Sequence, residues 1–374
     1  MKGWTRGIAL LVALAAVFVF RVQDLNLTPL IGAVDNRRFV QYTPYFPGLR
    51  ALDRHEIFSP ANTAKKKIVF LGASTVDSIG LDYTWHRPPP GVAPNVHAWG
   101  SIAGQLTEVL RASGRGDWEA YNLARNGAKL TSMLYVYARI LPLKPEVVVM
   151  GEAYEVDYKL WRNADADALD AQQYAYLDKT FGMYPETASI WSSYLDNLER
   201  HGWKRPPHVP PEVDYVVGPV PRERTSVLDL AEWLFANVEA AHLVPAIPRP
   251  VQYAVMREWT LPKVYPAEFD NLDPDFAYFR GIRLIAELQR RNGGRFFFYF
   301  SPQWEHHADA VYIEGLQNNF CAYMDMHGIP HANYVPVEMR PVFETYDGYH
   351  QTLAGNRRIA QMIYEDLVTR NLLE

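Results

Sequence analysis

The sequence predicts an α/β fold in which helices cover both faces of a parallel, doubly wound sheet. Three apolar runs support this prediction, beginning at Lys67, Trp118 and Glu146, and each is typical of a short buried strand. Each run belongs to a strand–loop–helix unit. Three such units in succession favour a parallel sheet. The helical crossover returns the chain to the end of the sheet at which the previous strand began, so the next strand runs in the same direction.

The remaining elements follow the same rhythm, apart from one interruption. Residues 156–272 are rich in aromatic residues and dotted with prolines, and we interpret them as an insertion that is helical in places and irregular elsewhere. The other predicted elements, taken in chain order, are helices over 99–110 and 130–141, a helix over 276–291, a strand over 295–300, a helix over 308–327, a strand over 331–335 and a final helix over 352–369.

Composition excludes several classes of protein. The 374 residues are 48% hydrophobic and 21% charged, as in globular proteins, and the net charge of -5 gives no reason to expect nucleic acid as a partner. With Cys321 as the single cysteine, an internal disulfide and a cysteine-based zinc site are both excluded. His306 and His307 are adjacent and would point in different directions on a helix, so we expect no metal site there. We also expect no cofactor.

The N-terminus predicts export. Lys2 and Arg6 precede an uncharged run over 7–20, which is typical of a signal anchor or a cleaved signal peptide. We favour an uncleaved anchor over residues 1–22, followed by a connector over 23–64 and one α/β domain over 65–374. The chain would then be held at the membrane by its N-terminal helix and face the periplasm or cell envelope.

Two short stretches carry the candidate chemistry. Ser74 follows the first strand, and ligands of open α/β sheets bind beyond the carboxyl ends of the strands. Asp347 and His350 lie just before the last helix, where one short loop can supply a general base and the acid that orients it. Alternatively, Ser74 is a loop or N-cap residue, Asp347 caps the final helix and His350 is a surface residue.

These stretches resemble the SGNH, or GDSL-type, hydrolase superfamily. Gly72-Ala73-Ser74-Thr75 is similar to its first block, Asn126-Gly127 to its second, and Asp347-Gly348-Tyr349-His350, followed by Leu353, Gly355 and Asn356, to its last. The resemblance implies a three-layer α/β/α flavodoxin-like sandwich. It also implies a catalytic triad of Ser74, Asp347 and His350, with an oxyanion hole made by the N–H groups of Ser74 and Gly127, to which Asn126 is a candidate contributor.

The third block departs from the pattern. The family has Gly-x-Asn-Asp where this chain has Gly151-Glu152-Ala153-Tyr154-Glu155, so the oxyanion-hole asparagine is missing. Glu152 and Tyr154 then become candidate substrate-binding residues. Two interpretations stay open. One is an exported serine esterase or O-acyltransferase acting on a small acyl ester, such as acetyl on a polysaccharide. The other is a catalytically degenerate subunit that binds carbohydrate or assembles with a membrane complex.

The resemblance to SGNH hydrolases also implies a candidate partner, a membrane acyltransferase, because proteins of this superfamily often work beside one. The aromatic side chains of the insertion, among them Trp161 and Trp191, are expected mostly in the core, with some available to stack on sugar rings.

Overall fold

A computed structural model gives the architecture of the chain. The structure describes residues 57, 65–77, 100–124, 128–152, 169, 171–200, 203–210, 277–302, 320–337, 339, 344, 351 and 353–374. The predicted N-terminal anchor, residues 1–22, lies outside these ranges. Within them, no helix combines the length and the apolar character that crossing a bilayer requires.

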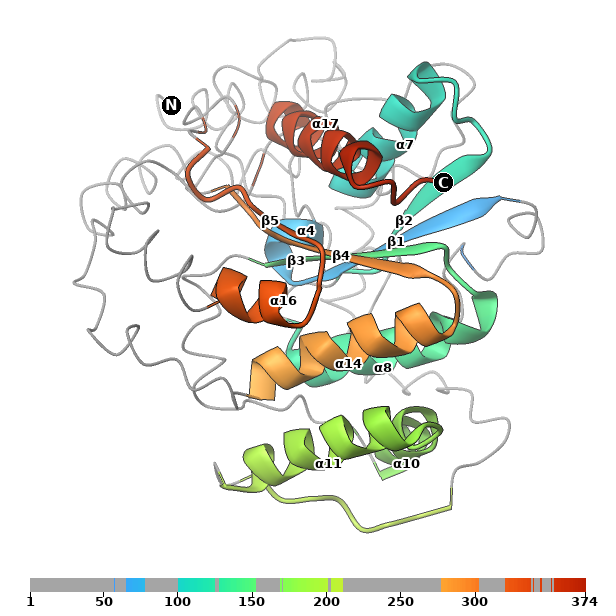
Figure 1. Cartoon of the computed structure of the whole chain (residues 1–374), viewed down its shortest axis with the longest axis vertical. Coiled ribbons are helices and arrows are strands. Elements are labelled where there is room, and N and C mark those ends of the chain that lie inside the picture. Colours follow the sequence, from blue (N-terminus) through green and yellow to red (C-terminus); the bar gives the residue numbers. More distant parts are fainter. Residues whose placement is uncertain are drawn as a thin grey trace, which may run out of the picture.

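The centre of the described part is a parallel sheet of five strands (Figure 1). The strands are β1 (Lys66–Gly72), β2 (Trp118–Asn122), β3 (Val147–Glu152), β4 (Arg295–Phe300) and β5 (His331–Asn333). Their order across the sheet is β2-β1-β3-β4-β5, and every neighbouring pair is parallel. This is the flavodoxin-like order, whose direction of winding reverses between β1 and β3. The predicted α/β class and parallel sheet are confirmed.

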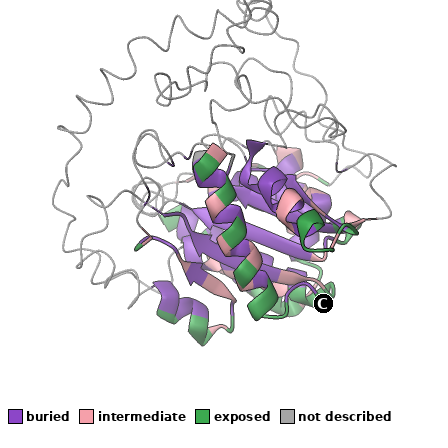
Figure 2. Ribbon diagram, turned by 90° about the horizontal axis from the view of Figure 1, so that it is seen from above, coloured by how far each residue is buried: buried purple, intermediate pink, exposed green. Residues whose placement is uncertain are grey.

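One face of the sheet is covered by α7 (Ile102–Ala112) and α17 (Leu353–Thr369), which pack side by side (Figure 1). Val76, from the one-turn helix α4 (Ser74–Asp77), joins the same buried cluster. Alternate strand residues, such as Ile68 and Phe70 of β1, point into this layer. Seen from above, the strands are almost wholly buried, and the exposed residues lie on the outer sides of the helices and in turns (Figure 2).

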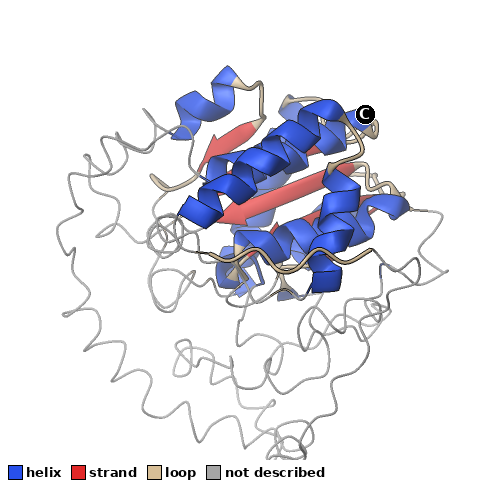
Figure 3. Ribbon diagram, turned by 90° about the horizontal axis from the view of Figure 1, so that it is seen from below, coloured by secondary structure: helices blue, strands red, loops and turns tan. Residues whose placement is uncertain are grey.

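The opposite face carries α8 (Leu130–Ile140), which continues into a short 3-10 turn over Leu141–Leu143, together with α14 (Ala277–Arg291) and α16 (Ala322–Met326). Beyond α8 and α14 lies a further helical layer, made by α10 (Ala171–Phe181) and α11 (Pro185–Arg200) (Figure 1). Figure 3 shows helices of this side lying across the strands.

The additional layer comes from the predicted insertion. Phe181, Trp191 and Tyr194 are buried, and Trp191 stacks on Tyr194 with ring centroids 5.4 Å apart. The indole N–H of Trp191 also donates to Asp178 over 2.7 Å. These aromatic side chains belong to the same hydrophobic cluster as α8 and α14, so they act as core residues. Trp161 lies outside the described residues.

Gln289 on α14 braces this side of the molecule. Its amide nitrogen donates to the carbonyl of Pro145 over 2.6 Å, and its amide oxygen accepts from the Tyr137 hydroxyl over 3.1 Å. Gln289 and Tyr137 are both buried, and burial raises the pKa of Tyr137 well above its ordinary value. The side chain thus joins α14 to α8 and to the turn that leads into β3.

Replacing Gln289 by Leu is expected to lower the free energy of unfolding by roughly 2–4 kcal/mol, because it leaves a buried hydroxyl and a buried carbonyl without partners. Urea denaturation measures this loss. Adding Tyr137→Phe removes the orphaned hydroxyl, so the double variant should lose less than the sum of the two single losses. If the losses of the two single variants simply added up, Gln289 and Tyr137 would not stabilise each other through their hydrogen bond.

Candidate functional site

The candidate nucleophile follows a tight turn at the end of β1. β1 ends at Gly72, and α4 begins two residues later at Ser74. A Cβ atom at position 72 would overlap both the Val76 side chain and the carbonyl oxygen of Gly151 on the neighbouring strand. Glycine is therefore required if β1 is to turn directly into α4 while it lies against β3.

The structure differs from the expected loop at this point. The small residues after Gly72 form a single helical turn, in which the Val76 N–H donates to the Ala73 carbonyl over 3.1 Å. Val76 is 1% exposed, and its burial beneath α7 and α17 secures the turn. Ser74 is thus the first residue of α4, where backbone N–H groups have no partner inside the helix. The Ser74 side chain lies outside what the structure describes.

The end of β3 forms the other side of the β1–β3 switch point. Gly72 and Gly151 are opposite each other in the register. A Cβ atom on Gly151 would overlap the fully buried ring of Tyr299, so only glycine leaves room for Tyr299 at this point of β3. Glu152, the next residue, is 0% exposed, and its carbonyl accepts from the Ser301 N–H over 2.8 Å.

Burial determines the pKa of Tyr299, which lies beside Glu152 at the carboxyl end of β3. Desolvation raises the pKa of Tyr299 well above its ordinary value, and the nearby Glu152 carboxylate raises it further, while Ser301 opposes the rise. The Tyr299 hydroxyl therefore keeps its proton at physiological pH. Glu152 stays a predicted substrate-binding residue, and Tyr154 lies outside the described residues.

The second predicted block follows β2, the strand beside β1. At the end of β2, the Asn122 side chain accepts from the Ala124 N–H over 3.1 Å, which turns the chain out of the sheet. On the far side, the Lys129 N–H donates to the Ser132 hydroxyl over 3.2 Å at the start of α8. Both ends of the short connection are thus fixed. Asn126 and Gly127, which lie between them, fall outside the described residues.

The third segment leads into α17. Arg358 binds Glu344 over 2.9 Å, and Glu344 is only 5% exposed. The carbonyl of Glu344 packs directly against Gly355, where no Cβ atom would fit. The Asn356 amide donates to the Gly100 carbonyl over 2.9 Å, which ties α17 to the start of α7. Residues 344 and 351 are therefore held on the first turns of α17.

The described parts of these three segments lie at the carboxyl ends of the strands. Ser74 follows the carboxyl end of β1, and residues 125–127 follow that of β2. α17 comes after the parallel strand β5 and packs on the sheet with its first turn joined to Gly100, at the start of α7. Asp347 and His350 lie outside the described residues, so their convergence on Ser74 stays a prediction.

Sequence reasoning identified Gly355 and Asn356 only as part of a motif, and the structure gives each a contact. It did not find the Glu344–Arg358 pair, whose spacing carries no recognisable pattern. In the described part of the chain, no group of three or more His, Cys, Asp or Glu side chains is placed to hold a metal ion. His306 and His307 lie outside it.

Comparison with known proteins adds little to this geometry. No protein-family model matches the sequence, and no curated protein is significantly similar to it. A solved structure titled "Crystal Structure of TesA" aligns with 82% of this chain and 100% of its own, at 12% sequence identity and a TM-score of 0.37. A likeness at that level does not establish a common fold or activity.

Proposed function

We propose that this chain is an exported, membrane-anchored serine esterase or O-acyltransferase that acts on a small acyl ester. The observation that carries the proposal is the position of Ser74. It begins α4 immediately after β1, beside the β1–β3 switch point where sheets of this order bind their ligands. The similarity of the Ser74 and Asp347–His350 stretches to SGNH hydrolases supports the same chemistry.

In the proposed reaction, His350 takes the proton of the Ser74 hydroxyl while the oxygen attacks the ester carbonyl. Asp347 orients His350 and stabilises the imidazolium. The N–H groups of Ser74 and Gly127, with Asn126, receive the oxyanion. Collapse of the tetrahedral intermediate breaks the ester C–O bond, and His350 returns the proton to the departing alcohol. Water or an acceptor hydroxyl then attacks the acyl-Ser74 carbonyl, which releases the acid or a new ester.

The proposed substrate is an acetyl ester on an envelope or exported polysaccharide, and the proposed partner is a membrane acyltransferase that supplies or shares acyl groups. Both follow from the resemblance together with the predicted anchor. Glu152 and Tyr154, just beyond β3, are the proposed contacts to this substrate.

Labelling with a fluorophosphonate tests the proposal. The purified full-length chain is expected to form one covalent adduct, and peptide mass spectrometry should locate it on Ser74. Heat-denatured protein serves as the control, because an unactivated serine does not react. Adduct formation on a different serine, or in the denatured sample to the same extent, would exclude Ser74 as the nucleophile.

A second candidate function is favoured by the end of β3. Glu152 is fully buried in the segment where SGNH hydrolases carry the oxyanion-hole asparagine. Loss of one such donor costs about 10²–10³ in rate, so a degenerate subunit that binds carbohydrate or assembles with a membrane complex is the alternative. No adduct on the folded chain, combined with co-purification of an integral membrane protein, would favour this alternative.

A further inference from the structure

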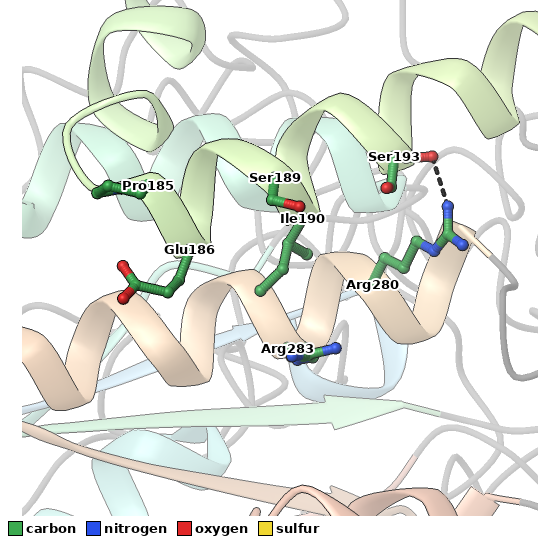
Figure 4. Close-up of a pocket in the computed structure, with 7 residues that line it drawn as sticks. All are labelled: Pro185, Glu186, Ser189, Ile190, Ser193, Arg280 and Arg283. Carbon is green, nitrogen blue, oxygen red and sulfur yellow. Dashed lines mark hydrogen bonds between the residues drawn. The ribbon is translucent and has the colours of Figure 1, made fainter.

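A groove between α11 and α14 lies outside the site described above (Figure 4). It has a volume of about 460 Å³ and is lined by Pro185, Glu186, Ser189, Ile190 and Ser193 of α11 and by Arg280 and Arg283 of α14. Small-molecule sites in proteins commonly measure roughly 300–1,000 Å³, so the groove is large enough for a metabolite-sized ligand.

The two helices run antiparallel, and polar groups of α11 bind arginines of α14 at both ends of the groove. Glu186 at the start of α11 binds Arg291 at the end of α14 over 2.9 Å. Seven residues further along α11, the Ser193 carbonyl accepts from Arg280 over 2.7 Å. Ser189 and Ser193 stand on the same side of α11, and Arg280 and Arg283 are one turn apart on α14 (Figure 4).

The carboxylates at one end of the groove are already engaged. Glu287 binds Arg290 and Arg291, each over 2.8 Å, and Glu186 is held by Arg291. Arg283, by contrast, forms no ion pair or hydrogen bond with the described part of the chain, although its side chain is half-buried in the groove. Among the described residues, this partly desolvated guanidinium therefore lacks a counter-charge, and a bound anion would supply one.

The positive charge of Arg283 affects the pKa of the neighbouring His327. The pKa of His327, which follows α16, is lowered by partial burial and then by the positive charge of Arg283. His327 packs edge-on against Tyr323 with ring centroids 4.4 Å apart, so its environment is defined. An anion on Arg283 would cancel part of this field.

We propose that the α11–α14 groove binds a small organic anion, whose carboxylate or phosphate group pairs with the Arg283 guanidinium. Arg280, held over the groove by Ser193, adds a second positive charge. Ser189 and Ser193 add polar groups to the α11 side of the groove, and Ile190 provides an apolar wall for the rest of the ligand. This proposal does not depend on the proposed esterase activity.

Calorimetry on the purified full-length chain tests the site, with citrate as the carboxylate probe and inorganic phosphate as the other. At least one probe is expected to bind, and Arg283→Gln should weaken it about tenfold or more. Arg283→Lys, which keeps the charge but loses the planar fork, should give an intermediate loss. Arg290→Gln is the matched control, because Arg290 is an exposed α14 arginine that does not line the groove.

The His327 imidazole gives an independent readout by NMR, assigned with a His327→Gln variant. A saturating probe should raise the His327 pKa toward its ordinary value in the wild type but not in Arg283→Gln. Failure of both probes to bind, equal weakening by Arg290→Gln, or an unchanged His327 pKa would overturn the proposal. Ser74→Ala should bind the probe as the wild type does, which separates this result from the fate of the esterase proposal.

Discussion

Ser74→Ala is expected to lower kcat/KM for ester hydrolysis by about 10³-fold or more, because the reaction loses its attacking oxygen. p-Nitrophenyl acetate is a suitable first substrate, since it carries the acetyl group of the proposed natural ester. The variant should keep the wild-type unfolding curve. Ser74 begins a one-turn helix that is secured by Gly72 and by the buried Val76, and removal of one hydroxyl leaves both contacts intact.

Ser192→Ala is the matched control, because Ser192 is an exposed serine on α11 that does not line the groove. It should hydrolyse the ester at the wild-type rate. Substitutions in residues that act together in one catalytic step have strongly non-additive effects on rate. Adding His350→Gln to Ser74→Ala should therefore lower kcat/KM almost no further. A Ser74→Ala variant that retained activity, or a double variant whose losses multiplied, would rule out the Ser74–His350 pair.

The sheet could be predicted from the sequence because its strands are encoded locally. β1, β3 and β4 are continuous apolar runs, and the sheet buries both of their faces. Predicted strand 295–300 matches β4 residue for residue. The crossover rule then leaves few topologies, so a parallel sheet follows from the alternation of strands and helices.

The contacts that hold the candidate site could not be predicted in the same way. Glu344 and Arg358 meet although they are 14 residues apart in the sequence, and Gly355 is needed because the carbonyl of Glu344 approaches it. Neither requirement appears in local periodicity. Similarly, α10 and α11 have ordinary amphipathic patterns, and nothing in them indicates that they form an outer layer on α8 and α14.

In Gly355→Ala, a gain in helix propensity competes with a steric overlap. We expect the steric overlap to prevail and the protein to lose stability. Gly355 is the third residue of α17, where helix propensity alone favours alanine by about 1 kcal/mol. The new Cβ atom, however, would overlap the backbone carbonyl of Glu344, which cannot rotate away as a side chain does, and would lie 2.9 Å from the Gln351 Cβ atom. Overpacking of this kind costs roughly 1–3 kcal/mol, which outweighs the gain in propensity.

Urea denaturation of Gly355→Ala should therefore show a net loss of stability. Gly116→Ala is the control, because a Cβ atom there meets nothing within 4 Å and should be neutral or slightly stabilising. Residues 345–350, which include Asp347 and His350, connect the two contacts that the substitution disturbs. Ester hydrolysis should consequently fall by more than the unfolded fraction explains. A stabilised, fully active Gly355→Ala protein would mean that the contact of the Glu344 carbonyl with Gly355 does not constrain α17.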